Sequence, residues 1–460
     1  MRRARPPQVD PASITRRIDT RSGPIGTGEI DPKVVPTESA AGIVSVLVNA
    51  AFRRLWLAQA FSQTAQNMIW WALFVQIGHL TNSTLGLGFG ILMVQIPTIL
   101  FAGLSGILTD RFSKRAILVW SNAVRAVGCL GYLAFVNNVG ALYAITFCVA
   151  VVNQPFQPAE TATIPLLVEK HQLMSANALF QITFLSSQVV GFLLGPTLVA
   201  LPGVGISRTF LVGVIMLAIA AVVLVPLPAI TRRRREVASE SLGHAAIQMF
   251  REMVEVSMVL AKDVRLGVAM IQLSLAPAIL LVLTQLGPKY VQQLLGTGTT
   301  NAMIILIAPA GVGLGLGLVL IDRFVHRLPK HRVAAWATIA MGLAIGALAI
   351  LPNVTGVLLS NWHVSRTLGA SLMTIPISFV LGVAASLLNA PAQTIVQERA
   401  DVDLRGRVFA LQLALGAAIT IPPIIAVGLV GQVLNDMSRT MGVLAVVVVV
   451  AGILTGREWD

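Results

Sequence analysis

The chain has 460 residues, of which 55% are apolar and only 12% are charged, and its formal net charge is +13. A soluble domain carries roughly twice that share of charged residues, so the composition excludes an ordinary soluble protein. Apolar runs of about 20 residues recur along the chain, which is the length of a helix that crosses a bilayer about 30 Å thick. Because backbone polar groups in lipid must be satisfied within the segment, we expect helices and an all-α polytopic membrane protein.

Four segments organise the chain. Residues 1–50 are rich in proline and arginine and predict a disordered basic tail, whereas residues 51–229 and 265–460 each contain six apolar runs and predict two six-helix bundles. Between them, residues 230–264 predict a cytoplasmic linker with an amphipathic helix at residues 245–260. The twelve predicted spans are residues 55–80, 84–109, 116–136, 141–168, 176–201, 209–225, 266–286, 300–321, 333–351, 369–396, 408–434 and 441–455.

The surplus of basic residues falls at the ends of apolar runs, on alternate sides of the membrane. This distribution is the positive-inside pattern and does not resemble a nucleic-acid-binding face. It predicts a multi-pass protein of a bacterial-type cytoplasmic (plasma) membrane, with both termini in the cytoplasm. We therefore expect contact with membrane lipid and none with nucleic acid.

The first span is unusually polar for a membrane helix. Its amides recur with Trp70 at helical spacing, so that they share a face. Two interpretations remain open, namely hydrogen bonding between helices and the wall of a substrate cavity. The cavity candidates on this span are Gln63, Gln66, Asn67 and Trp70.

A charged hinge follows the second span, in a chain where charge is otherwise scarce, and the second half carries a degenerate copy of it. The hinge either anchors the loops at the cytoplasmic face or forms a charge network that latches the two halves in one state. A few ion pairs suffice to bias such an equilibrium. The candidate latch residues are Gly106, Asp110, Arg111, Lys114, Arg115, Asp322 and Arg323.

Two charges lie deep inside predicted spans. A rise of 1.5 Å per residue places Arg125 and Glu160 at similar depths, roughly 12 to 15 Å from the inner surface. Intramembrane charges usually have a partner, so we predict that Arg125 and Glu160 form a pair. The alternative is that Arg125 snorkels inward while Glu160 faces water. Glu160 is the only acidic residue deep in any predicted span and is therefore the candidate proton site.

The hinge resembles the signature of the major facilitator superfamily, with Ser113 in place of the usual glycine. On the fifth span, Gly191, Gly195 and Pro196 resemble the antiporter motif of exporters in that superfamily. Further stretches resemble its macrolide-efflux and enterobactin-exporter branch of drug:proton antiporters, and the resemblance covers about residues 50 to 455. These stretches are residues 52–59, 158–168, 176–179 and 405–409.

The resemblance implies two six-helix bundles around a central cavity and alternating access. It implies a monomer without cofactor or metal that exports a small amphipathic compound, with protons as the exchanged ion. In this fold the first, fourth, seventh and tenth helices line the cavity. The resemblance therefore adds to the cavity candidates Asn153, Gln157, Gln272, Asn389 and Gln393.

The leading functional prediction is a secondary-active exporter of hydrophobic or amphipathic compounds, of the multidrug-efflux kind. An enzyme is not expected, because the sequence shows neither a P-loop nor clustered nucleophile chemistry inside the spans. A lysolipid-type transporter or an uncoupled facilitator remains open, since the predicted interior is poor in acids. A non-transporting membrane sensor on the same fold also remains open, although the intact hinge of the first half argues against it.

Overall fold

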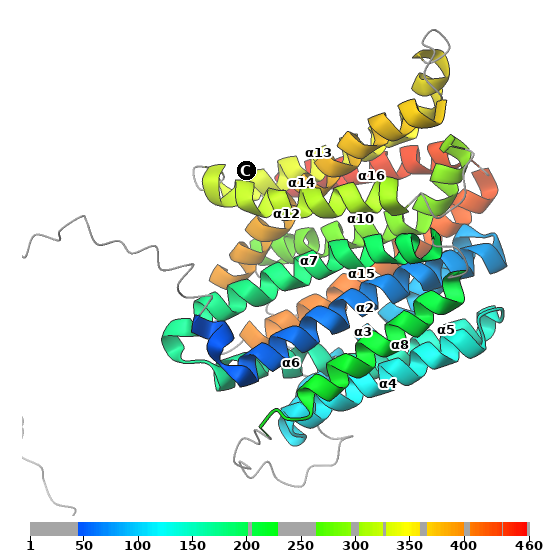
Figure 1. Ribbon diagram of the computed structural model, residues 1–460. Coiled ribbons are helices and arrows are strands. Elements are labelled where there is room, and N and C mark those ends of the chain that lie inside the picture. The colour runs from blue at the N-terminus through cyan, green and yellow to red at the C-terminus, as the bar shows by residue number, and fades with distance from the viewer. Residues whose placement is uncertain are drawn as a thin grey trace, which may run out of the picture. The chain divides into compact units, whose positions relative to one another are not determined.

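The computed structural model describes residues 45–200, 205–228, 264–295, 303–324, 328–358, 366–399, 405–434 and 436–457. Within these ranges the chain is helical and contains no β-strand, and most helices run alongside one another (Figure 1). The predicted all-α fold is therefore confirmed. Most of the predicted tail and the predicted linker, including its amphipathic helix at residues 245–260, lie outside the described residues.

Six spanning segments make up the first half. The fourth segment is broken into two helices, α5 and α6. In chain order these helices are α2 (Ala50–Thr81), α3 (Thr84–Arg111), α4 (Lys114–Ala134), α5 (Val139–Asn153), α6 (Phe156–Leu167), α7 (Leu173–Ala200) and α8 (Gly205–Leu224).

The second half also contributes six segments, one of which begins with a turn of π-helix, η3. They are α10 (Val264–Leu295), η3 (Met303–Ile307) with α12 (Ala308–Phe324), α13 (Lys330–Leu358), α14 (Arg366–Arg399), α15 (Arg405–Leu434) and α16 (Met437–Arg457).

Ten of these twelve segments are long and apolar enough to cross a membrane. The remaining two are α2, whose amides lower its hydropathy, and α12, which is only 17 residues long before η3 is added. The last span begins at Met437, within the range 435–440 that was the predicted alternative to a start at residue 441. The predicted arrangement of twelve spans in two halves thus matches the described helices.

Packing is mostly within each half. In the first half, α2 packs on α7 and α8, and α4 packs on α5 and α8; in the second half, α13 packs on α14 and α16, and α12 packs on α14. The halves meet where α3 packs on α15 and α10 and where α7 packs on α12 and η3. The largest buried cluster of apolar side chains draws on both halves, so the halves share a core.

Short polar residues set the helix boundaries by accepting hydrogen bonds from the first free backbone amides. Asn49 caps α2 in this way, Ser83 caps α3, and Asn138 caps α5. Ser113 caps α4 through the amide of Ala116 at 3.3 Å. The serine that departs from the family's glycine in the hinge therefore has a structural role, because it starts the third span.

The fourth span was predicted at residues 141–168 and is found at Val139–Leu167, but it is not one unbroken helix. The chain leaves the helix at Gln154 and Pro155 and resumes it at Phe156. Proline lacks the backbone N–H that a continuing helix needs, so Pro155 interrupts the hydrogen-bond ladder. The interruption occurs where polar side chains are concentrated, and it positions the candidate site described next.

Candidate functional site

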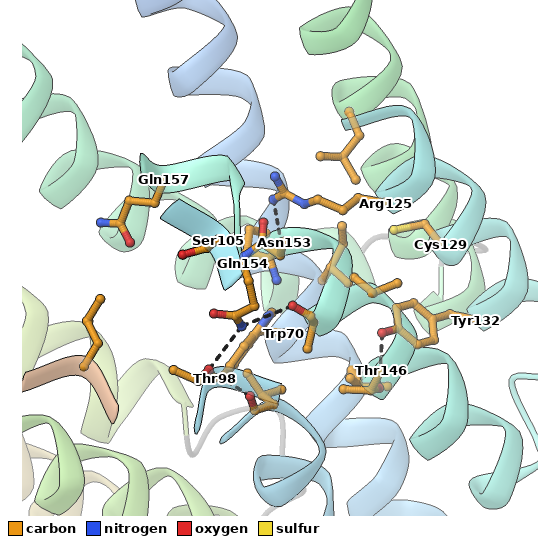
Figure 2. A pocket seen from close by; sticks show the side chains of 18 of the residues that line it. Trp70, Thr98, Ser105, Arg125, Cys129, Tyr132, Thr146, Asn153, Gln154 and Gln157 are labelled. Carbon is orange, nitrogen blue, oxygen red and sulfur yellow. Dashed lines mark hydrogen bonds between the residues drawn. The ribbon is translucent and has the colours of Figure 1, made fainter. Parts of the chain in front are cut away.

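A polar cavity of about 210 Å³ lies against the break between α5 and α6. Its walls come almost entirely from helices of the first half, with Leu413 of α15 as the contribution from the second half. Figure 2 shows its polar side chains gathered from α2 to α6 around the broken segment. The polar residues on its wall include Gln66, Thr98, Ser105, Arg125, Tyr132, Thr146, Asn153, Gln154 and Gln157.

Arg125 on α4 is the charged residue of this wall, and it is only 3% exposed. Its guanidinium donates to the hydroxyl and the backbone oxygen of Ser62, at 3.0 and 3.4 Å. It also donates to Gln66 Oε1 at 2.6 Å and to Asn122 Oδ1 at 3.4 Å. The charge is thus held by neutral oxygens, largely from α2, while the Nε–H group has no hydrogen-bond partner.

Phe156, the first residue of α6, packs its ring 5.2 Å from the carbon at the centre of the Arg125 guanidinium. A guanidinium over an aromatic face is stabilised by the ring's quadrupole. The break in the fourth span therefore places both an aromatic face and polar amides around the same buried cation.

Glu160 lies one turn further along α6 and is 4% exposed. Its helix α6 packs on α4, which carries Arg125. Among the described residues, however, no direct ion pair joins them, because the guanidinium bonds to Ser62, Gln66 and Asn122 instead. A direct ion pair between Arg125 and Glu160 therefore stays a prediction.

The amides at the break complete the wall. Gln154 Nε2 donates to Thr98 Oγ1 on α3 and to the backbone oxygen of Ala150, both at 3.2 Å. The side-chain oxygen of Asn153 is buried without a partner. Gln157 is exposed and makes no such bond in the described contacts.

A second, larger cavity of about 340 Å³ lies between the halves. Its walls come from α2 and α7 of the first half and from α10, η3, α12, α13 and α14 of the second. Leucines and other apolar side chains dominate, and the described lining residues include no charged group. Trp70 lines both this apolar cavity and the polar one.

Comparison with known proteins identifies the family. The model of the Major Facilitator Superfamily matches residues 55–422, most of the chain. The chain belongs to the Major Facilitator Superfamily. It is therefore a multi-pass membrane protein of a transporter family, as the hinge and the twelve spans predicted.

Among curated relatives, the enterobactin exporter EntS of Citrobacter koseri is 28% identical over 160 residues. The match covers 34% of this chain and 38% of that exporter, so it spans little more than a third of the relative's length. EntS of Escherichia coli O1:K1 is 25% identical over 158 residues, with the same coverage. The predicted resemblance to the enterobactin-exporter branch is thus confirmed within the superfamily.

Two solved structures share the fold. A mutant of the nucleoside transporter NupG has a TM-score of 0.71 and 16% identity, over 89% of this chain and 100% of that chain. The peptide-transporter-family protein PepTSo has a TM-score of 0.66 and 13% identity, over 88% and 97% of the two chains. At these identities the likeness concerns the fold of the superfamily alone.

The structure brings together several of the predicted cavity residues and separates others. Gln66, Trp70, Asn153 and Gln157 line the polar cavity, and Asn67 lines the apolar one. Gln63 lies on neither wall, and its backbone oxygen accepts a hydrogen bond from the Asn67 amide.

The three second-half candidates lie on neither of these walls. Gln272 is fully buried in helix packing, and neither atom of its amide has a hydrogen-bond partner. Asn389 is half-buried and Gln393 is exposed. The polar wall of the site, as described, therefore comes from the first half.

The motif glycines on α7 have a packing role. A Cβ atom at Gly191 would lie 2.7 Å from the backbone oxygen of Thr64, and one at Gly195 would lie 2.6 Å from the Trp71 ring. The two glycines therefore let α7 approach α2 closely, and Pro196 follows them within the same helix.

The predicted latch is described only in part. Arg115 donates to the backbone oxygen of Leu227, just beyond α8, at 3.2 Å. Arg111 is exposed at the end of α3, and Lys114 opens α4. The side chains of Asp110, Asp322 and Arg323, and the surroundings of Gly106, lie outside what the structure describes. The latch stays a prediction.

Several wall residues escaped the sequence analysis, notably Thr98, Ser105, Tyr132 and Gln154. Hydroxyl residues in apolar runs commonly bond to their own helix, as Thr98 does to the oxygen of Val94, so they give little functional signal. Gln154 stood beside Pro155, and that dipeptide was the signal that could have located the break.

Proposed function

We propose that the protein exports small hydrophobic or amphipathic compounds across the plasma membrane by alternating access, in exchange for protons. The observation that carries the proposal is the polar cavity at the break in the fourth span, with Arg125 on its wall and Glu160 buried nearby. The chain's membership of the Major Facilitator Superfamily supports a transport role for this cavity. The partial match to an enterobactin exporter supports the direction of transport.

Glu160 is the residue on which the proton exchange depends. Burying an unpaired carboxylate costs several kcal/mol, so its protonation responds to any change in the surrounding charge. A compound that enters the polar cavity changes the hydrogen bonding and the hydration beside Arg125, and with them the electrostatic environment of Glu160. Glu160 is thus suited to release its proton when the compound binds and to take one up after the compound leaves. In this proposal both termini lie in the cytoplasm, as the positive-inside pattern predicts.

The test is transport in proteoliposomes that contain the purified protein. Vesicles with an acidic lumen are given a panel of macrolides, lipophilic cations, lysolipids and enterobactin in the outer medium. An antiporter accumulates its substrate as protons leave the lumen, and accumulation stops when the gradient is collapsed. We expect Glu160→Gln to abolish the gradient-driven part.

Glu169→Gln is the matched control, because Glu169 is an exposed acid at the end of the same span, beside His171. It is expected to accumulate the substrate as the native protein does. Transport that is unaffected by the gradient and by Glu160→Gln would overturn the proton exchange.

An uncoupled facilitator or a lysolipid-type transporter is the second candidate. The observation that favours it is the apolar cavity, whose described wall carries no charged group and suits a hydrocarbon chain. In the same vesicles this candidate predicts movement of lysolipid down its own gradient, unchanged by the pH of the lumen. A non-transporting sensor would bind a compound of the panel without moving it across the vesicle membrane.

A further inference from the structure

Trp70 stands between the two cavities and lines both (Figure 2 labels it on the polar side). Residues three and four apart share a face of a helix, so α2 can present two neighbouring stripes to two different spaces. Gln66, Ile69 and Leu73 line the polar cavity. Asn67 and Phe74 line the apolar cavity. Trp70 lies where the two stripes meet, and its ring packs edge-on against Phe74, with the ring centres 5.5 Å apart.

We propose that the polar and apolar cavities are two compartments of one ligand site, and that the ligand is an amphiphile with a neutral hydroxyl head group. The head group, a phenol or an alcohol, occupies the polar compartment beside Arg125, and the apolar body passes Trp70 into the other compartment. This inference rests on the proposed function in taking the cavities as the transport site, and it adds the chemical class of the ligand.

The charge of the polar compartment argues against a cationic head group. Arg125 is the charged residue on the described wall, and no carboxylate stands beside it there. Glu160 is buried on α6 and does not line the cavity. In a low-dielectric interior a second positive charge near a guanidinium is repelled far more strongly than in water. A lipophilic ammonium is therefore a poor fit.

Unsatisfied hydrogen-bonding groups on the same wall favour a hydroxyl. Arg125 Nε–H is a buried donor without an acceptor, and Asn153 Oδ1 is a buried acceptor without a donor. A hydroxyl group both donates and accepts, so it is suited to a wall that offers both an unpaired donor and an unpaired acceptor. A carboxylate accepts only and would leave the Asn153 oxygen without a donor.

The apolar compartment fits the rest of such a molecule. Its volume of about 340 Å³ exceeds that of the polar compartment, about 210 Å³. Leucines from α10 and α14 form much of its wall, and Phe192 closes it from α7. Burying hydrocarbon there supplies roughly 0.8 kcal/mol per methylene, which a head group alone cannot match.

Binding to the full-length protein in lipid nanodiscs tests the assignment, with empty nanodiscs subtracting partition into lipid. The probes are para-octylphenol, para-octylbenzyltrimethylammonium, which has the same body and a cationic head, and phenol, which lacks the tail. We expect the octylphenol to bind at least about tenfold more tightly than the ammonium compound, the size of one charge-assisted interaction. Arg125→Gln should bring this ratio close to one.

Gly311→Leu tests the apolar compartment without touching the buried arginine. A Cβ at Gly311 meets only the Val189 side chain, at an ordinary contact distance of 3.5 Å, and Gly311 lines the apolar cavity, so a leucine there is expected to take up space in it. Its matched control is Gly315→Leu on the same helix, where a Cβ meets nothing within 4 Å and which lies on neither cavity wall. We expect Gly311→Leu to weaken octylphenol about tenfold and to leave phenol unchanged, because only the tail loses its space.

Two results would overturn the inference: ammonium binding as tight as that of octylphenol, or octylphenol binding that Gly311→Leu and Gly315→Leu affect equally. Neither result tests proton exchange, which is measured as the gradient-driven accumulation that Glu160→Gln loses in the transport assay. Conversely, transport that ignores the proton gradient, together with the expected probe preference, would overturn the antiport and leave the two-compartment site in place.

Discussion

The side-chain amide of Gln285 on α10 donates a hydrogen bond to the backbone oxygen of Thr84, 2.9 Å away at the beginning of α3. The same nitrogen donates to the oxygen of Ile424 on α15 at 3.1 Å. One fully buried amide therefore ties a helix of the first half to two helices of the second. Gly88 and Gly428 make room for it, since a Cβ at either position would lie 2.6 or 3.1 Å from the Gln285 nitrogen.

Gln285→Leu should loosen this end of the protein, which the charge pattern predicts to face the outside. Two buried hydrogen bonds are lost, at a cost of about 1 to 3 kcal/mol in total. We expect the population open at this end to rise about tenfold or more. The measurement is maleimide labelling of Leu87→Cys, a position that is 2% exposed, in a Cys148→Ser background that removes the exposed native cysteine.

Gln432→Leu is the matched control for the Gln285 variant. Gln432 also joins α15 to α3, through a 3.0 Å bond to Ser83 Oγ, but this bond is exposed to solvent. Water replaces an exposed bond at little cost, so labelling of Leu87→Cys should hardly change. Equal labelling in both variants would mean that the Gln285 amide does not hold the end closed.

Gly191→Ala should destabilise the protein by separating α7 from α2. The added Cβ would meet the backbone oxygen of Thr64 and the Asn67 side chain, each at 2.7 Å, and backbone atoms cannot rotate away. Such overpacking costs about 1 to 3 kcal/mol. The thermal unfolding midpoint in detergent should fall. Gly315→Ala, whose Cβ meets nothing within 4 Å, should leave the midpoint unchanged or raise it slightly.

The fold was predictable because it depends on properties that are local in the sequence. Apolar runs of spanning length predicted the helices, and the polar face of α2 contributes Gln66 and Trp70 to the wall of the polar cavity. Asn153 and Gln157 followed from the analogy between helices of this fold. The same analogy placed Gln272 on the cavity, whereas the structure buries it in helix packing.

The unpredicted features depend on partners that are distant in the chain. Gln285 bonds to Thr84, 201 residues away, and nothing near either residue indicates the other. Arg125 was expected to meet Glu160, but its hydrogen bonds go to Ser62, Asn122 and Gln66, which depend on the rotation of α4 against α2. Depth along a helix follows from residue counts, whereas rotation about its axis is set by packing.

Pro155→Ala should impair transport without impairing folding. The alanine restores a backbone donor at the break, so α5 and α6 can join into one helix. The free energy of unfolding should therefore stay the same or rise by about 1 kcal/mol. The amides of Asn153 and Gln154 would then rotate away from the polar cavity that they line. The readout is transport per folded protein, with folding followed by gel filtration.

Pro165→Ala is its control, because Pro165 is an exposed proline inside α6 and lies on neither cavity wall. It should transport as the native protein does. Normal transport by Pro155→Ala would show that the break does not position the site.

Exchanging the two buried charges, Arg125→Glu with Glu160→Arg, should fail to restore transport. The reason is that Arg125 donates to the backbone oxygen of Ser62, and a carboxylate at that position cannot donate to it. Arg125→Glu alone leaves buried acceptors unpaired, at about 3 to 5 kcal/mol, and the second change does not replace them. Arg125→Lys keeps the charge but loses the planar fork that reaches Ser62 and Gln66, so partial transport is expected. Recovery of transport in the exchanged variant, measured beside both single variants, would instead support a direct pair of Arg125 and Glu160 formed in another state of the cycle.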